Sequence, residues 1–256
     1  MYNLADKIKN EKIDASNVAI YWLGGASYVI KSHKTIFGLD LYLSDACKNE
    51  KDDYKRLVPS PIEPEDIVFD FIIATHDHGD HFDTGSIDKM VNEKTQTKLV
   101  GPTSVMDAAK KINLDECLLV KLDRNEKVTI SNCELSGVFA DHGTSAPDCI
   151  GVIIKIGRKN IYFTSDTCYR PDLPELIKFD QPIDLLIVPI NGKFGNPDSK
   201  DASYITAWVK PKVVIPSHFW LFKEHGGDPG TFVEYCMQIA PNSIIKVPAI
   251  GESLIL

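Results

Sequence analysis

Three of the seven histidines fall within six residues, in the run Thr75-His-Asp-His-Gly-Asp-His81. The run follows an apolar segment, so a rigid strand would fix where these side chains begin and a loop could turn them toward one point. Neutral imidazole and carboxylate groups are suitable ligands for Zn²⁺, Mn²⁺ or Fe²⁺. His76 and His78 can bind one ion, and Asp80 and His81 can turn toward a second ion nearby. The spacing therefore predicts a two-metal site.

Three further potential ligands each come just after a predicted strand. They are His142 after residues 134–140, Asp166 after residues 160–164 and His218 after residues 212–215. Polar residues commonly follow strands for structural reasons, so each of the three, taken alone, could equally be structural. Beside the histidine cluster, they match the pattern expected if several strands converge on one rim.

The remaining candidates lie in loops and could contact a substrate. His225 precedes two glycines and follows His218 closely in the chain. It either contacts substrate or transfers a proton, or it belongs to a structural turn. Asn191, Lys193 and Arg170 could hold a phosphate or carboxylate, although ordinary solvated loop residues would look the same.

The elements that position these residues form two predicted β-meanders, each followed by mixed strands and helices. Strands are predicted over residues 18–23, 27–30, 35–39, 67–75, 98–100, 118–122, 127–130, 134–140, 152–156, 160–164, 184–188 and 212–215. Helices are predicted over residues 87–91, 103–111, 202–209 and 231–239, and a long loop over 44–66. This pattern favours the α+β class: an αββα sandwich of two mixed β-sheets with helices on both outer faces, in a single domain spanning 1–256.

Composition indicates an ordinary globular protein. The chain has 256 residues, of which 43% are hydrophobic and 25% charged, enough for a sizeable core. The net charge of −8 argues against a broad nucleic-acid surface. The six cysteines form no Cys-x-x-Cys pair, and neither a signal peptide nor an apolar run of about 18 residues is visible. We expect a cytoplasmic homo-oligomer that acts on a small molecule, with no nucleic-acid or membrane partner.

The motifs, in this order, resemble the metallo-β-lactamase superfamily over nearly the whole chain. The L-ascorbate-6-phosphate lactonase (UlaG-like) branch is the most similar, through the segments Ala74–Asp83, Pro189–Asn196 and Ile215–Phe222, the last continuing to His225-Gly-Gly-Asp-Pro229. Ser165 stands where the superfamily usually has glycine before the aspartate.

The resemblance also implies a complete set of metal ligands. The first ion would be bound by His76, His78 and His142, the second by Asp80, His81 and His218, with Asp166 bridging the two. The cofactors would be two divalent metal ions, Mn²⁺ or Zn²⁺.

The function expected from this site is metal-dependent hydrolysis. Two ions that share a water would lower its pKa and produce a hydroxide that attacks a small, anionic ester or lactone, such as a sugar-phosphate lactone. Asp80 would be both ligand and proton acceptor, and His225 the second catalytic residue. One alternative is a phosphodiesterase or ribonuclease of the same fold, which the acidic composition disfavours. The other is a metal-binding protein without turnover, which the complete ligand set disfavours.

Overall fold

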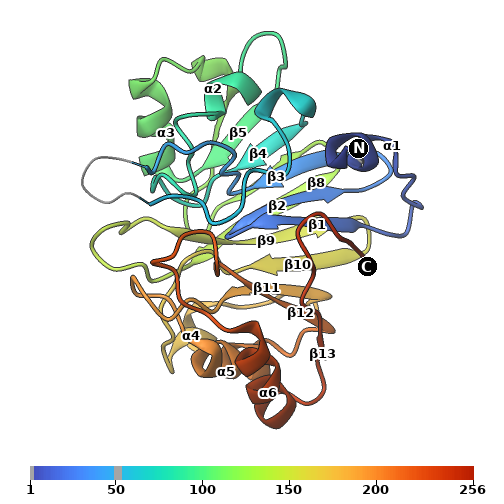
Figure 1. Ribbon diagram of the computed structural model, residues 1–256, viewed down its shortest axis with the longest axis vertical. Coiled ribbons are helices and arrows are strands. Elements are labelled where there is room, and N and C mark those ends of the chain that lie inside the picture. Colours follow the sequence, from blue (N-terminus) through green and yellow to red (C-terminus); the bar gives the residue numbers. More distant parts are fainter. Residues whose placement is uncertain (1–2, 49–53) are drawn as a thin grey trace.

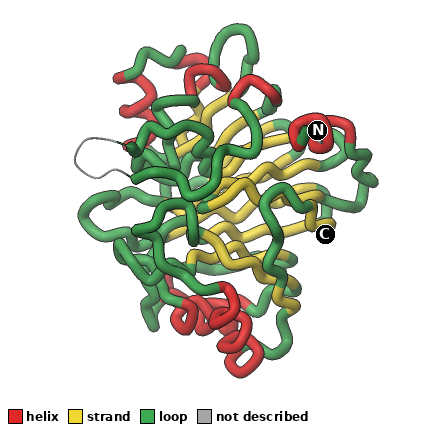
Figure 2. Tube along the Cα trace, in the orientation of Figure 1, coloured by secondary structure: helices red, strands yellow, loops and turns green. Residues whose placement is uncertain are grey.

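The structure is a computed structural model that describes residues 3–48 and 54–256. Two seven-stranded sheets form the centre of the described part, with helices on either side (Figures 1 and 2). In the order of its strands, the first sheet consists of β14 (Ser253–Ile255), β1 (Ala19–Gly24), β2 (Ser27–Lys31), β3 (Ile36–Leu39), β4 (Phe71–Ile73), β5 (Lys98–Gly101) and β6 (Leu119–Lys121). The second consists of β13 (Ile244–Ile245), β12 (Val213–Ser217), β11 (Leu185–Pro189), β10 (Lys159–Phe163), β9 (Ile150–Ile156), β8 (Cys133–Phe139) and β7 (Lys127–Ile130).

Helices cover the outer face of each sheet. The first sheet carries α1 (Leu4–Asn10), α2 (Ile87–Met90) and α3 (Thr103–Lys111), and the second carries α4 (Leu173–Leu176), α5 (Ser199–Val209) and α6 (Pro229–Ile239). Two short 3₁₀ helices, η1 (Pro64–Asp66) and η2 (Glu116–Leu118), lie in connections on the first sheet's side of the chain. The arrangement confirms the predicted αββα sandwich of two mixed sheets.

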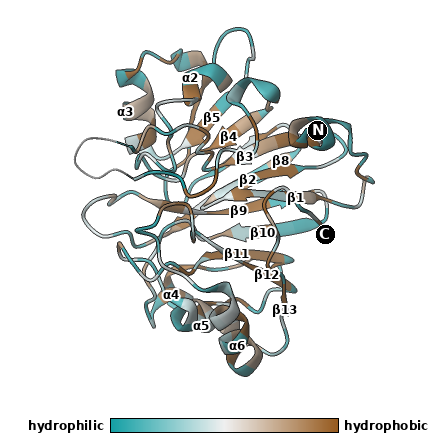
Figure 3. Cartoon of the chain, in the orientation of Figure 1, coloured by the Kyte–Doolittle hydropathy of each residue, from teal (hydrophilic) through white to brown (hydrophobic). Residues whose placement is uncertain are grey.

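The two sheets pack face to face through large apolar side chains. Tyr28 of β2 meets Phe163 of β10 edge to face, with ring centroids 6.3 Å apart, so the contact joins the two sheets directly. Both side chains are buried in one continuous cluster with Phe37 of β3 and Ile154 of β9. Figure 3 shows hydrophobic residues along strands of both sheets, among them β4 and β11. Burial of this surface is the main force that holds the sandwich together.

Strand direction determines where the predicted ligands meet. β8 and β10 both run antiparallel to β9, and β11 and β12 run parallel to β10. The carboxyl ends of β8, β10, β11 and β12 therefore lie at one edge of the second sheet. Three predicted ligands come just after these strands: His142 after β8, Asp166 after β10 and His218 after β12. All three therefore lie at the same rim.

One predicted strand is too long. The structure has β4 only over Phe71–Ile73, whereas the apolar run predicted a strand over 67–75. Ile67 and Phe69 are buried and Val68 is exposed, so this part of the run packs against the core by its side chains without forming a ladder. Helices α1 and α4 and strands β13 and β14 were not predicted. Within the described part of the chain, no helix is long and apolar enough to cross a lipid bilayer.

Candidate metal centre

Three histidines from two loops form what we call the first donor group: His76, His78 and His142. Nε2 of His76 lies 3.1 Å from Nδ1 of His78, and Nε2 of His142 lies 3.2 Å from the same His78 atom. His76 and His78 follow β4, and His142 follows β8. The two sheets therefore both contribute to this group.

Asp80, His81 and His218 form the second donor group. Nε2 of His218 lies 3.0 Å from Nε2 of His81 and 3.3 Å from Oδ2 of Asp80, while His81 Nε2 lies 3.7 Å from the same Asp80 oxygen. A tight turn, in which the amide of His81 donates to the carbonyl of His78, brings Asp80 and His81 to this side of the loop. His218 has a φ of 57°, a left-handed conformation that is typical of functional sites.

Asp166 lies between the two groups. Its Oδ1 is 3.3 Å from Nε2 of His218 and 3.6 Å from Nε2 of His81, and its Oδ2 is 3.6 Å from Nε2 of His142. Oδ1 is buried and has no hydrogen-bond partner among the residues that the structure describes. His81 also comes within reach of His76 and Asp166, so the two groups form one continuous centre.

These spacings fit divalent cations better than a hydrogen-bond network. Zn²⁺ binds nitrogen and carboxylate oxygen at about 2.0–2.2 Å, which places neighbouring ligand atoms about 3 Å or slightly more apart. Two facing imidazole nitrogens, such as those of His81 and His218, can share at most one proton, whereas a cation attracts both lone pairs. A cation would also satisfy the buried Oδ1 of Asp166. The residues present therefore fit two divalent ions.

A buried carboxylate orients one of the imidazole rings. Oδ2 of Asp40 lies 2.6 Å from Nδ1 of His81, and Thr75 donates to the same carboxylate through its hydroxyl at 2.7 Å and its amide at 2.9 Å. A proton held at Nδ1 of His81 leaves Nε2 free for a metal, the usual arrangement of a ligating histidine.

Two supporting residues were missed. Asn196 donates from Nδ2 to Oδ2 of Asp166 at 2.8 Å and accepts from the amide of Thr167 at 3.0 Å, so it fixes the rotation of the carboxylate. Ser165 adopts a φ of 59° and donates its hydroxyl to Thr75 at 2.6 Å. The left-handed backbone explains why glycine is usual at this position, and the hydrogen bond explains what serine adds.

Substitutions of Ser165 separate these two effects. Ser165→Ala keeps the left-handed strain and loses the hydrogen bond, so we expect the free energy of unfolding to fall by about 1 kcal/mol. Ser165→Gly loses the same bond but relieves strain of about 1 kcal/mol, so its stability should stay close to that of the parent. Urea unfolding of the three proteins measures both values. A glycine variant no more stable than the alanine variant would contradict the strain argument.

For His76, Asp80 and Asp166, the electrostatics of the centre match the protonation states that metal binding needs. Burial lowers the pKa of His76 well below its ordinary value. Burial alone would raise the pKa of Asp80, but the rings of His81 and His218 outweigh it and hold that pKa well below its usual range. The same rings have the same effect on the pKa of Asp166. Both carboxyls are therefore ionised and His76 is neutral, the forms in which each binds a cation. Burial would lower the pKa of His81 and of His218, but the Asp166 and Asp80 carboxylates outweigh it and raise both, so a bound ion would displace a proton from each ring.

A cavity of about 470 Å³ opens onto the centre. Members of both donor groups line it together with Asp166, and the rest of the lining comes from Cys47, Tyr54, Gly79, Ser145, Phe194, Phe222 and His225. A cavity of this size accommodates a small organic molecule beside the donor atoms.

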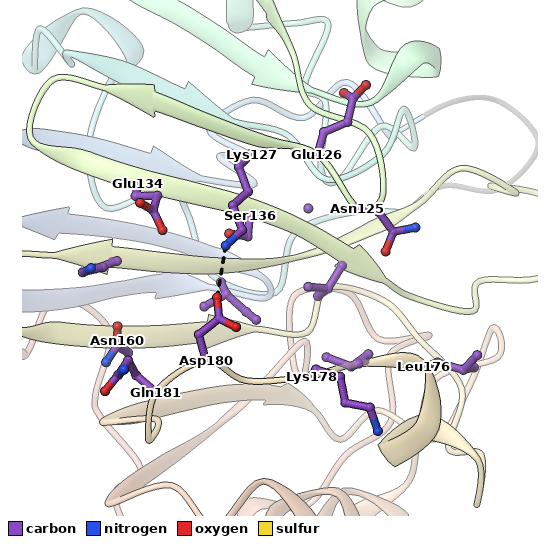
Figure 4. A pocket seen from close by; sticks show the side chains of 15 residues that line it. Asn125, Glu126, Lys127, Glu134, Ser136, Asn160, Leu176, Lys178, Asp180 and Gln181 are labelled. Atoms are coloured by element: carbon purple, nitrogen blue, oxygen red, sulfur yellow. Dashed lines mark hydrogen bonds and ion pairs between the residues drawn. The ribbon is translucent and has the colours of Figure 1, made fainter.

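Another hollow lies on the outer face of the second sheet, across β7, β8 and β9 (Figure 4). Charged, polar and apolar side chains all line it, and Nζ of Lys127 pairs with Oδ2 of Asp180 at 3.1 Å across it. Both of these side chains are exposed. Among the described residues, the groups able to hold a metal all lie at the rim of the strands instead, so we place the chemistry there.

The structure brings one of the four predicted substrate-contacting residues into the metal cavity. His225 lines it, with its ring 4.5 Å from that of His218 and its Nε2 3.9 Å from Oδ2 of Asp80. Burial, and then the neighbouring His218, lower the pKa of His225 to about 3.

The other three lie elsewhere. Asn191 and Lys193 line a neighbouring hollow. The Arg170 guanidinium donates to carboxylate oxygens of Asp141 at 2.8 Å and Asp172 at 2.6 Å. Arg170 is therefore already paired with two carboxylates.

Comparison with known proteins places the chain in a family. A family described as "Beta-lactamase superfamily domain" matches residues 40–219. The chain is 26% identical over 247 residues to a UPF0173 metal-dependent hydrolase of Carboxydothermus hydrogenoformans, covering 93% of this chain and 99% of that protein. It is 29% identical over 246 residues to a UPF0173 metal-dependent hydrolase of Pyrococcus furiosus, with the same coverage.

Solved structures agree on the fold. The metallo hydrolase Igni18 of Ignicoccus hospitalis superposes with a TM-score of 0.73 at 19% identity, over 94% of this chain and 98% of that one. The family match extends over more than half of the sequence, from Asp40 through the histidine run and Asp166 to His218. The chain therefore belongs to the metallo-β-lactamase superfamily.

Proposed function

We propose that this protein is a metal-dependent hydrolase that holds two divalent ions, Zn²⁺ or Mn²⁺, and cleaves a small ester or lactone. The position of Asp166 carries the proposal, because its two carboxylate oxygens face different donor groups. The names of the two UPF0173 relatives support the reaction class. The lactonase branch suggested by the sequence segments supports the choice of ester or lactone.

The bound ions would supply a water of lowered pKa and a Lewis acid for the attacked oxygen. The first donor group, the second donor group and Asp166 would hold them. Asp80 is the proposed proton acceptor, because its side chain is 18% exposed toward the cavity while that of Asp166 is 5% exposed. Asp40 and Asn196 would keep His81 and Asp166 in place without touching the substrate.

A comparison of substrates tests the reaction class. Chelated protein, reloaded with Zn²⁺ or Mn²⁺, would be assayed with p-nitrophenyl acetate, δ-valerolactone and bis-(p-nitrophenyl) phosphate. We expect metal-dependent turnover of the ester or lactone at least about a hundredfold above that of the phosphodiester. Faster phosphodiester cleavage would establish the alternative nuclease-like function. Full metal content with no turnover of any of the three would favour a binding protein.

His225 is the proposed second catalytic residue. Its Nε2 lies 3.9 Å from Oδ2 of Asp80, and Asp80, His218 and His225 are close enough to hold an ion together. Because His81 already completes the second donor group, we place the ring of His225 against the substrate. A pKa of about 3 leaves the ring neutral near pH 7, so it would act on the reacting atoms as a hydrogen-bond donor or a proton acceptor. If it takes part in the chemical step in this way, His225→Ala should keep both ions and lose about 10²–10⁴-fold in kcat. A rise in KM with unchanged kcat would indicate orientation of the substrate instead.

The control for this variant is His33→Ala, which removes an exposed histidine distant in sequence from the metal ligands. Metal content and steady-state kinetics of both variants would be measured side by side. Loss of one ion from His225→Ala would show that the ring is a ligand, and unchanged kinetics with a lowered Tm would show that it is a structural turn.

Three further expectations stay predictions. We expect one domain over residues 1–256, a cytoplasmic location and a homo-oligomeric state.

A further inference from the structure

Three aromatic side chains, Tyr54, Phe194 and Phe222, form a wall of the metal cavity, which we call the aromatic wall. The ring of Tyr54 lies 5.5 Å from that of Phe222 and 6.5 Å from that of Phe194. The ring of His225 contacts the wall, at 4.8 Å from Phe222 and 6.1 Å from Phe194. Aromatic surface therefore lies directly beside the residues proposed to carry the chemistry.

Phe194 lines the cavity in a conformation that is unfavourable for the stability of the folded protein. Its side chain is 54% exposed, so it contributes little to the core. Its φ is 56°, in the left-handed region that bulky residues rarely adopt, and the turn around it contains Gly192 and Gly195. A strained, exposed aromatic residue is unfavourable for stability, and such residues concentrate at binding sites. Because Phe194 also lines the metal cavity, a ligand bound there would contact its ring.

Away from the metal centre, the side chains that line the cavity offer no cation to an anionic substituent. Among the described residues that line it, none is lysine or arginine, and Asp80 and Asp166 are both carboxylates. The cations suggested by the sequence, Lys193 and Arg170, lie in another hollow or in ion pairs. A phosphate or carboxylate away from the reacting bond would lose its hydration without gaining a fixed partner cation from these residues.

We propose that the aromatic wall binds a neutral, apolar acyl or aryl group of the substrate, so that the preferred substrate is an uncharged ester or lactone and not a sugar phosphate. The proposal rests on the proposed function, because it assigns the other end of the substrate to the metal centre. It replaces the anionic substrate expected from the sequence. The wall packs against one face of a flat group, while the cleaved bond lies toward Asp80 and His225.

Binding of hydroxamic acids tests the wall without any turnover, because the hydroxamate chelates the metal centre and its substituent faces the wall. Isothermal titration calorimetry of the metal-loaded protein would compare acetohydroxamic, benzohydroxamic and 4-carboxybenzohydroxamic acids. We expect the phenyl compound to bind about tenfold tighter than the methyl compound, through buried apolar area and ring contacts. The carboxylated compound should bind no tighter than the phenyl compound.

Phe194→Ala should reduce the advantage of the phenyl group to about threefold or less, and leave the affinity for acetohydroxamic acid unchanged. Trp220→Ala is the matched control, because Trp220 is also exposed, at 56%, has the same φ of 56° and lines a different groove. This control should keep the full preference.

The opposite results would overturn the proposal. They are equal binding of the methyl and phenyl compounds by the parent protein, tighter binding of the carboxylated compound, or a phenyl preference that survives Phe194→Ala. Failure of all three compounds to bind metal-loaded protein would also overturn it. If the protein hydrolyses esters but shows no preference for the phenyl compound, the proposed function is supported and the binding role of the aromatic wall is refuted. If the protein prefers the phenyl compound but hydrolyses no ester, the binding role of the aromatic wall is supported and the proposed function is refuted.

Discussion

Asp166→Ala is expected to weaken both metal positions together, because one carboxylate faces both donor groups. We expect the affinity for each of two ions to fall by about a hundredfold or more, since the variant removes a charged ligand from each. Turnover should fall by about a thousandfold or more. Stepwise calorimetric titration with Zn²⁺ or Mn²⁺, together with kinetics, measures both effects.

Asp172→Ala is the control for this experiment. Asp172 is a half-exposed carboxylate that pairs with Arg170 and does not line the cavity, so its loss should change neither metal affinity. Loss of a single ion from Asp166→Ala, with the other bound as in the parent, would show that the carboxylate serves only one position.

Single substitutions in the two donor groups should have separable effects. His76→Ala removes a ligand from the first group and should weaken that ion, while His81→Ala should weaken the ion of the second group. His81→Ala has a further consequence, because within the described part of the chain it leaves the fully buried Asp40 with only its hydrogen bonds from Thr75. We therefore expect its unfolding free energy, measured without metal, to fall by about 1–3 kcal/mol.

Metal analysis by mass spectrometry and urea unfolding together test this pair. The two variants should each retain close to one ion per chain under conditions in which the parent retains two. Full metal content in both would refute the ligand assignment. Equal stability of His81→Ala and the parent, without metal, would refute the supporting role of Asp40.

Much of the fold could be predicted because apolar alternation and turn residues mark most strands. The elements and boundaries that the sequence did not predict have physical explanations. β14 is three residues long and exists through its pairing with β1, more than two hundred residues away in the chain, which no local pattern reveals. α5 and α6 begin earlier than predicted because Asp198 and Asp228 cap them, accepting from backbone amides of the first turn. Aspartate is a favoured N-cap residue, so the sequence carries a signal for both of these helix starts.

The candidate ligands could be predicted because metal binding requires histidine and carboxylate side chains at strand ends, and histidine is scarce in this chain, with three of its seven histidines within six residues. The substrate-contacting residues could not, since side-chain direction within a loop depends on turn geometry. In the loop after β11, Lys193 lines a neighbouring hollow while the adjacent Phe194 lines the metal cavity. Its positive charge made Lys193 the expected substrate contact. For Phe194, the only feature in the sequence that suggests a substrate contact is an apolar ring in a glycine-containing turn.

Diffraction from crystals grown with Zn²⁺ or Mn²⁺, recorded at the absorption edge of the metal, tests the central proposal most directly. We expect two anomalous peaks about 3.5–4 Å apart, one within bonding distance of each donor group. Asp166 should contact both peaks, one through each oxygen. A single peak, or two peaks of which Asp166 contacts only one, would contradict the two-metal centre.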